Sequence, residues 1–92
     1  MVMDPDLLEL ASFFMDSMRE DLVQMRRSLD LGDMETIRRL GHSHKGAAGT
    51  YGFPFLAALG VRVQRAAERN DAKELGGLFL ELERYLDSVE IT

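Results

Sequence analysis

Residues 32–54, GDMETIRRLGHSHKGAAGTYGFP, contain two consecutive pairs of helix stop and start signals. Gly32 is typical of the end of a helix, and the aspartate behind it is a good N-cap for the next one. Gly52 and Pro54 repeat the pattern, because glycine favours the C-terminal end of a helix and proline its first turn. The segment between the two signals, which reaches about Tyr51, is therefore predicted to be one helix.

A long amphipathic helix is predicted on the N-terminal side of this segment. Asp4 is a typical N-cap, and Pro5 occupies the first helical position. Apolar residues then recur at alternating spacings of three and four, which is the period of a helix with one buried face. This helix ends at Gly32 after about seven turns. Its apolar residues are Leu7, Ala11, Phe14, Met18, Leu22, Met25 and Leu29.

Two more helices are predicted on the C-terminal side. One opens at Pro54 and reaches Asn70. Asp71 and Glu74 then form a capping box for the last helix. The apolar stripe of that helix consists of Leu75, Leu78, Leu82, Tyr85 and Val89.

The pattern as a whole predicts an all-α fold. No segment alternates between apolar and polar residues with the period of a strand. Four long helices with short connections predict an antiparallel up-down four-helix bundle. A chain of 92 residues leaves no room for a second core, so residues 1–92 are expected to form a single domain.

The composition excludes several functional classes. The chain has a formal net charge of −5 and no cysteine. The absence of cysteine excludes disulfides and thiolate chemistry, which favours a cytoplasmic location. No apolar stretch is long enough to cross a bilayer, and the opening Met-Val-Met-Asp lacks the basic region of a signal peptide.

Charge is distributed unevenly along the chain. Residues 36–67 contain five basic residues and no acidic one, so this segment carries +5 and the remainder carries −10. An acidic protein is a poor general binder of nucleic acid, and neither nucleic acid nor a membrane is expected as a partner. The basic segment is instead a candidate site for an anionic group or an acidic partner.

The only two histidines of the chain fall on opposite faces of the second predicted helix. Each residue advances about 100° around a helix, which places His44 on the apolar face and His42 about 180° from its centre. His44 is therefore expected at the edge of the core with a hydrogen-bond partner. His42 is expected to face solvent. Two cationic residues and two glycines lie within about 60° of it on the helical wheel, namely Arg38, Lys45, Gly46 and Gly49.

The glycines of this helix are unusual in a helix interior. Each destabilises a helix by about 1 kcal/mol relative to alanine, and such local violations are typical of functional sites. Gly41 is best explained by the close approach of a neighbouring helix. Gly46 and Gly49 project toward solvent beside His42, and we interpret them as part of a functional surface.

The string His42-Ser-His-Lys45-Gly46-Ala-Ala-Gly49-Thr-Tyr-Gly52-Phe53 resembles the H-x-x-K-G-x-x-x-x-x-G signature of histidine phosphotransfer (HPt) domains. That family includes the phosphoacceptor domain of chemotaxis histidine kinases. Its fold is a four-helix bundle with the acceptor histidine exposed on the second helix, and the resemblance covers essentially the whole chain. It implies that His42 is the phosphoacceptor. His44 departs from the pattern, because the family usually has an aliphatic residue there.

The resemblance also implies a polar residue on the third helix that hydrogen-bonds the acceptor imidazole. It lies twenty-two positions after the histidine, which is Gln64 in this chain. His42 lies ten residues before Gly52 and Gln64 ten after Pro54, so the two reach the same level in an antiparallel pair. Chemotaxis kinases tend to have glutamate at this position and stand-alone phosphotransfer proteins often have glutamine, which favours a shuttle.

The function that the resemblance implies is a shuttle between receiver aspartates in a two-component phosphorelay. His42 would attack the phospho-aspartate of a response-regulator receiver domain, and a sensor or hybrid histidine kinase would act upstream. Lys45, and more weakly Arg38, would offset charge on the transferring oxygens. Gly46 and Gly49 would leave space for the receiver, which brings the Mg²⁺, so no cofactor of the chain's own is expected. The protein would be a monomeric phosphotransfer intermediate without kinase or phosphatase activity of its own.

Two residues of the first helix, Leu10 and Phe13, lie off its main apolar stripe. They are candidates for a receiver-facing apolar patch beside His42, and the alternative is a stripe wide enough to touch two neighbouring helices. Two alternatives also stay open for the function: a phosphoacceptor domain of a chemotaxis-type histidine kinase, and a helical interaction module without phosphotransfer.

Other chemistries fit these residues less well. His42 and His44 are two positions apart and point to opposite faces, whereas a helical metal site needs histidines three or four apart, so no metal site is predicted. Residues 41–46 are not followed by Lys-Ser/Thr and no strand precedes them, which excludes a phosphate loop. No second group for general acid and base hydrolysis is visible beside His42.

Overall fold

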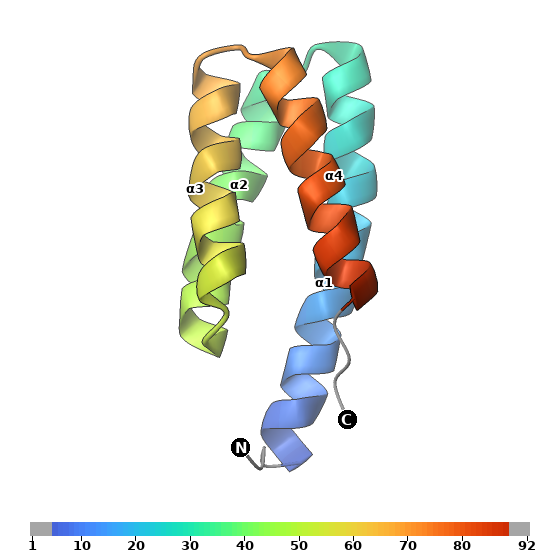
Figure 1. Ribbon diagram of the computed structural model, residues 1–92, viewed down its shortest axis with the longest axis vertical. Helices are drawn as coiled ribbons and strands as arrows, with labels where there is room; N and C mark the ends of the chain where they lie inside the picture. The colour runs from blue at the N-terminus through green and yellow to red at the C-terminus, as the bar shows by residue number, and fades with distance from the viewer. Residues whose placement is uncertain (1–4, 89–92) are drawn as a thin grey trace.

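The fold is an antiparallel up-down bundle, as predicted. The computed structural model describes the backbone of residues 5–88 and the side chains of residues 9–88. Each helix packs against two neighbours, α1 against α2 and α4, and α3 against α2 and α4. The N-terminal part of α1 extends beyond the other three helices (Figure 1). The helices are α1 (Pro5–Leu31), α2 (Met34–Tyr51), α3 (Pro54–Glu68) and α4 (Ala72–Ser88).

Two glycine turns separate the first three helices at the predicted positions. Gly32 and Gly52 have φ angles of 73° and 79°, in the left-handed region that glycine enters without strain. The Asp33 carboxylate accepts hydrogen bonds from the backbone N–H of Thr36 at 3.2 Å and from its hydroxyl at 2.6 Å. These contacts begin α2 where the sequence predicts it.

The connection between α3 and α4 differs from the prediction in two details. The sequence predicted that α3 reaches Asn70, but the helix ends at Glu68 because Asn70 takes a left-handed φ of 56°. Asp71 caps α4 by accepting the N–H of Glu74 at 3.0 Å. The reciprocal half of the predicted capping box does not form, because the Glu74 side chain pairs with Arg69 instead.

The core contains side chains from all four helices, and the predicted apolar stripes point into it. Leu7 and Val89 lie outside the described side chains. Three residues that the stripes missed, Met15, Phe79 and Leu86, are also buried. A helix in a four-helix bundle touches two neighbours, so it buries a wider face than a single stripe.

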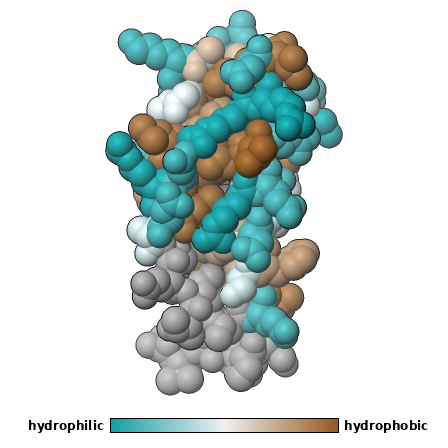
Figure 2. Space-filling model, turned by 90° about the vertical axis from the view of Figure 1, so that its right-hand side faces the viewer, coloured by the Kyte–Doolittle hydropathy of each residue, from teal (hydrophilic) through white to brown (hydrophobic). Residues whose placement is uncertain are grey.

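The face formed by α1 and α4 is largely polar. Hydrophilic side chains cover much of it, with apolar surface visible between them (Figure 2). Arg26 of α1 and Glu83 of α4 form an ion pair across this face, and Arg19 donates a hydrogen bond of 3.0 Å to the Leu86 carbonyl. None of the helices in the described part of the chain has the length and apolar character that crossing a bilayer requires.

Candidate functional site

The structure brings His42 and Gln64 together. His42 is exposed on α2, Gln64 is half-buried on α3, and Nδ1 of the imidazole lies 3.3 Å from Oε1 of the amide. With Oε1 as the acceptor, the neutral ring has its proton on Nδ1 and keeps a free lone pair on Nε2. The contact therefore fixes one tautomer and leaves the other nitrogen available as a nucleophile.

The backbones of α2 and α3 touch directly beneath this pair. A Cβ atom at Gly41 would lie 2.8 Å from the backbone nitrogen of Gln64 and 2.9 Å from the carbonyl oxygen of Gly60. This confirms that Gly41 admits a neighbouring helix. Gly60 was not among the residues predicted to take part in this contact, although it lies one turn before Gln64 on the same helix.

Gly46 and Gly49 face solvent, as the helical wheel predicted. Both are exposed, and a Cβ atom at either position would meet no atom within 4 Å. The Thr50 hydroxyl donates a hydrogen bond of 3.1 Å to the Gly46 carbonyl. The surface beside His42 is therefore bare backbone along two further helical turns.

The two cations that flank His42 differ in their surroundings. Lys45 is exposed, and no ion pair involves it within residues 9–88. The Arg38 guanidinium donates hydrogen bonds of 2.9 Å and 2.6 Å to the Glu35 carboxylate. This contact raises the pKa of Arg38 and lowers the pKa of Glu35. Lys45 is therefore the cation better placed to meet an incoming anion.

The basic segment of residues 36–67 carries less local charge than the sequence indicated. Arg38 pairs with Glu35, and Arg62 pairs with Glu81 of α4 at 3.3 Å. Both acidic residues lie outside the segment in the sequence, so the net charge calculated for residues 36–67 does not include them. Among residues 9–88 the basic residues of this segment that form no ion pair are Arg39, Lys45 and Arg65, so two of its five positive charges are offset.

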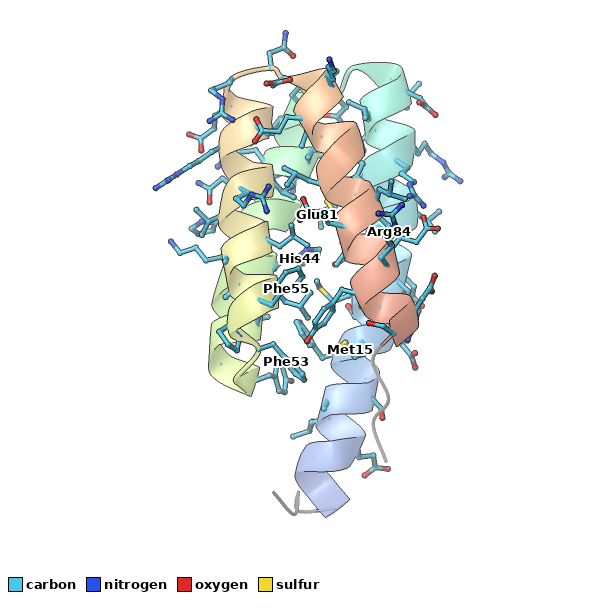
Figure 3. The ribbon with its side chains drawn as sticks, viewed as in Figure 1. Met15, His44, Phe53, Phe55, Glu81 and Arg84 are labelled. Atoms are coloured by element: carbon cyan, nitrogen blue, oxygen red, sulfur yellow. The ribbon has the colours of Figure 1, made fainter. Side chains whose placement is uncertain are left out.

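His44 lies inside the bundle, between the helices (Figure 3). Its side chain is 6% exposed, and Nε2 lies 2.8 Å from the Asp21 carboxylate of α1. The expectation of a histidine at the edge of the core with a hydrogen-bond partner is confirmed. His42 and His44 therefore point to opposite sides of α2, and no group of three potential metal ligands occurs among the described residues.

Leu10 and Phe13 are exposed at 48% and 72%. The alternative that they belong to a wide buried stripe, packed against two neighbouring helices, is therefore wrong. Both residues remain available to contact a partner.

The position of this patch differs from the expectation. The Asp21–His44 contact sets the register of α1 against α2. Phe13 lies eight residues before Asp21, and His42 lies two before His44 on the antiparallel helix. At 1.5 Å per residue, Phe13 is about 15 Å from His42 along the bundle axis. The patch is therefore not beside His42 but near the C-terminal end of α2.

A bundle with an exposed, hydrogen-bonded histidine on its second helix is the arrangement of a phosphotransfer module. The chain belongs to the Hpt family, because its residues 9–91 match the Hpt domain. The match covers nearly the whole chain. Membership supports histidine phosphotransfer in phosphorelays as the general function, and interaction with kinases and receiver domains. Comparisons with curated proteins and with solved structures gave no match.

Proposed function

We propose that this protein shuttles a phosphoryl group between response-regulator receiver aspartates through His42. The contact between Nδ1 of His42 and Oε1 of Gln64 is the observation that carries this proposal. It keeps the proton of the neutral ring on Nδ1, so that Nε2 can present its lone pair to an incoming phosphoryl group. Every other group assigned to the reaction lies on the same pair of helices, so a single copy of the chain suffices.

In the forward step, Nε2 of His42 attacks the phosphorus of an aspartyl phosphate on the receiver. The N–P bond forms as the P–O bond to the aspartate breaks, and the aspartate leaves as a carboxylate. Nδ1 keeps its proton, and Gln64 accepts a hydrogen bond from the ring, which has become cationic. The reverse step returns the phosphoryl group to a second aspartate, with no proton transfer in either direction.

Lys45 supplies positive charge close to the phosphoryl group, whose oxygens are negatively charged. Its side chain leaves α2 one turn from His42, within about 60° of it around the helix. An ammonium near the phosphoryl oxygens lowers the repulsion between them and the incoming carboxylate. Gly46 and Gly49 leave the receiver room to approach the ring, because no Cβ projects there.

The Mg²⁺ that the family uses does not fit the residues of this chain. Arg38 and Lys45 flank His42, and no set of three potential ligands occurs among residues 9–88. We therefore assign the metal to the receiver, and no step above depends on a metal ligand from this protein.

The test is incubation with phosphorylated receiver domains, followed by detection of phosphate on this protein. A phosphohistidine is labile in acid and stable in base, and His42→Gln serves as the control without the nucleophile. Transfer from a receiver supports the shuttle. Labelling only by a histidine kinase with ATP would indicate the chemotaxis-type acceptor domain instead, and no labelling by either donor would indicate an interaction module.

A further inference from the structure

We propose that Gly41 and Gly60 are positioning residues for His42. The expected effect of this role on phosphate transfer rests on the proposed function. The absence of two Cβ atoms lets α3 approach α2 closely enough for Gln64 to fix the imidazole tautomer. Neither glycine touches the reacting atoms, so both act through Gln64.

The two glycines make a reciprocal contact between the helices. A Cβ atom at Gly60 would lie 2.8 Å from the Gly41 carbonyl oxygen and 2.8 Å from the backbone nitrogen of Lys45. A Cβ atom at Gly41 would lie 2.8 Å from the backbone nitrogen of Gln64. Each glycine therefore faces the backbone of a site residue on the opposite helix. Backbone atoms cannot rotate away as a flexible side chain can, so an added methyl group must separate the helices.

The required separation exceeds what the hydrogen bond tolerates. Ordinary contact of a Cβ atom begins at 3.4 Å, so a distance of 2.8 Å must grow by about 0.6 Å. The contact between His42 and Gln64 is already 3.3 Å long, at the upper end of the range for a hydrogen bond. With the Gln64 side chain in its present rotamer, a shift of this size would carry Oε1 beyond hydrogen-bond distance of Nδ1 and remove the tautomer preference of the ring.

The other helical glycines provide matched controls. Among residues 5–88, a Cβ atom would meet no obstruction within 4 Å at any helical glycine except Gly41 and Gly60. Gly76 of α4 is one of the open positions, and it has no part in the site. Gly76→Ala therefore makes the same chemical change as Gly60→Ala without forcing any helices apart.

The experiment measures the ¹⁵N chemical shifts of the His42 imidazole at a pH where the ring is neutral. The parent and Gly76→Ala are expected to show the tautomer with the proton on Nδ1. Gly60→Ala, Gly41→Ala and Gln64→Ala are all expected to lose this preference and to give a mixture. In the two glycine variants, transfer from a receiver is expected to slow severalfold while the dissociation constant of the receiver complex stays unchanged.

The outcomes separate the two proposals, because the tautomer is read without any phosphate transfer. A parent that shows the Nδ1–H tautomer but accepts no phosphate would refute the shuttle and leave the positioning role intact. A folded Gly60→Ala that keeps both the tautomer and the transfer rate would overturn the positioning role. So would a parent that lacks the tautomer preference. If neither glycine variant folds, the glycines serve the bundle as a whole, and the positioning role is again overturned.

Discussion

His44 and Asp21 form a hydrogen bond of 2.8 Å that joins α2 to α1 inside the bundle. The bond occupies Nε2, and the His44 side chain is almost fully buried. His42, two residues earlier, is exposed on the other side of the same helix. The structure thus gives two histidines of one helix different chemical surroundings: His44 is buried and hydrogen-bonded to Asp21, and His42 is exposed.

We expect His42→Gln to abolish phosphate labelling and His44→Leu to retain it. Because His42 is exposed, its replacement should change the free energy of unfolding by less than about 0.5 kcal/mol. Leucine fits the apolar surroundings of His44, and Asp21 keeps access to water. Acid-labile phosphate and urea unfolding of both variants provide the measurements. Labelling that survives loss of His42 but disappears with His44 would reverse the assignment.

Lys45→Ala should slow phosphate transfer more than it weakens receiver binding. The ammonium acts on charge that accumulates at the phosphoryl group during the reaction, whereas the docked surfaces are much larger than one side chain. Rapid-quench rates at saturating receiver, together with calorimetric affinities, separate the two effects. The association rate should also fall as salt increases, because exposed charges are screened beyond about 8 Å at physiological ionic strength. Salt-independent binding and normal transfer by Lys45→Ala would show that this charge has no role.

Gly46→Gln should be folded and strongly impaired in accepting phosphate. Gly46 lies one turn after His42 in open space, so a side chain there projects toward the docked receiver without touching the bundle. Replacing a helical glycine should also stabilise the domain by up to about 1 kcal/mol. Thermal unfolding and transfer kinetics test both effects. Full transfer by a stable Gln variant would contradict the need for bare backbone at this position.

Phe13→Ala should weaken receiver binding by less than about fivefold and leave transfer at saturation unchanged. A standard interface covers about 800 Å² on each partner, so its edge lies about 16 Å from the centre if its outline is circular. Phe13, about 15 Å from His42 along the axis, then falls near the rim, where truncation has small effects. Calorimetric titration with a receiver gives the affinity. A loss greater than tenfold would instead place Phe13 at the centre of the interface.

Acid should destabilise the N-terminal end of α2. Hydrogen bonds from Thr36 lower the pKa of Asp33 below its ordinary value, and hydrogen bonds from Arg38 do the same for the pKa of Glu35. A carboxyl group with a lowered pKa stabilises the fold above its unfolded pKa, and this contribution is lost as pH falls through its folded pKa. Asp33→Asn keeps a good N-cap that cannot titrate. Its melting temperature should therefore fall less than that of the parent between neutral pH and about pH 3. Equal slopes in the two proteins would refute this role of Asp33.

Local signals in the sequence were sufficient to predict the four helices and their antiparallel arrangement. Gly32, Gly52 and Pro54 act within one or two turns of the chain, so their effects could be read without knowledge of the packing. The exposure of His42 followed in the same way from its angle to the apolar stripe. The predicted end of α3 at Asn70 was wrong by two residues, because asparagine tolerates both the helical and the left-handed conformation and takes the latter here.

Several contacts between helices could not be read from the sequence, although the pairing of His42 with Gln64 and the close approach at Gly41 were predicted. The Asp21 partner of His44 depends on the register of α1 against α2, which periodicity does not set. The lack of space for a Cβ atom at Gly60 depends on the distance between the backbones of α2 and α3. The position of Leu10 and Phe13 relative to His42 also depends on the register of α1 against α2. The ion pair of Arg38 with Glu35, in contrast, could have been predicted, because oppositely charged residues three apart on one helix lie side by side.

The direct contact between α2 and α3 has a consequence for the order of folding. His42 and Gln64 are 22 residues apart, whereas the hydrogen bond from Arg19 to Leu86 joins residues 67 apart. Closing the longer loop costs about 1 kcal/mol more in chain entropy. We therefore expect the helical hairpin of α2 and α3, which contains His42, to assemble early. The contacts between α1 and α4 should form late and open first.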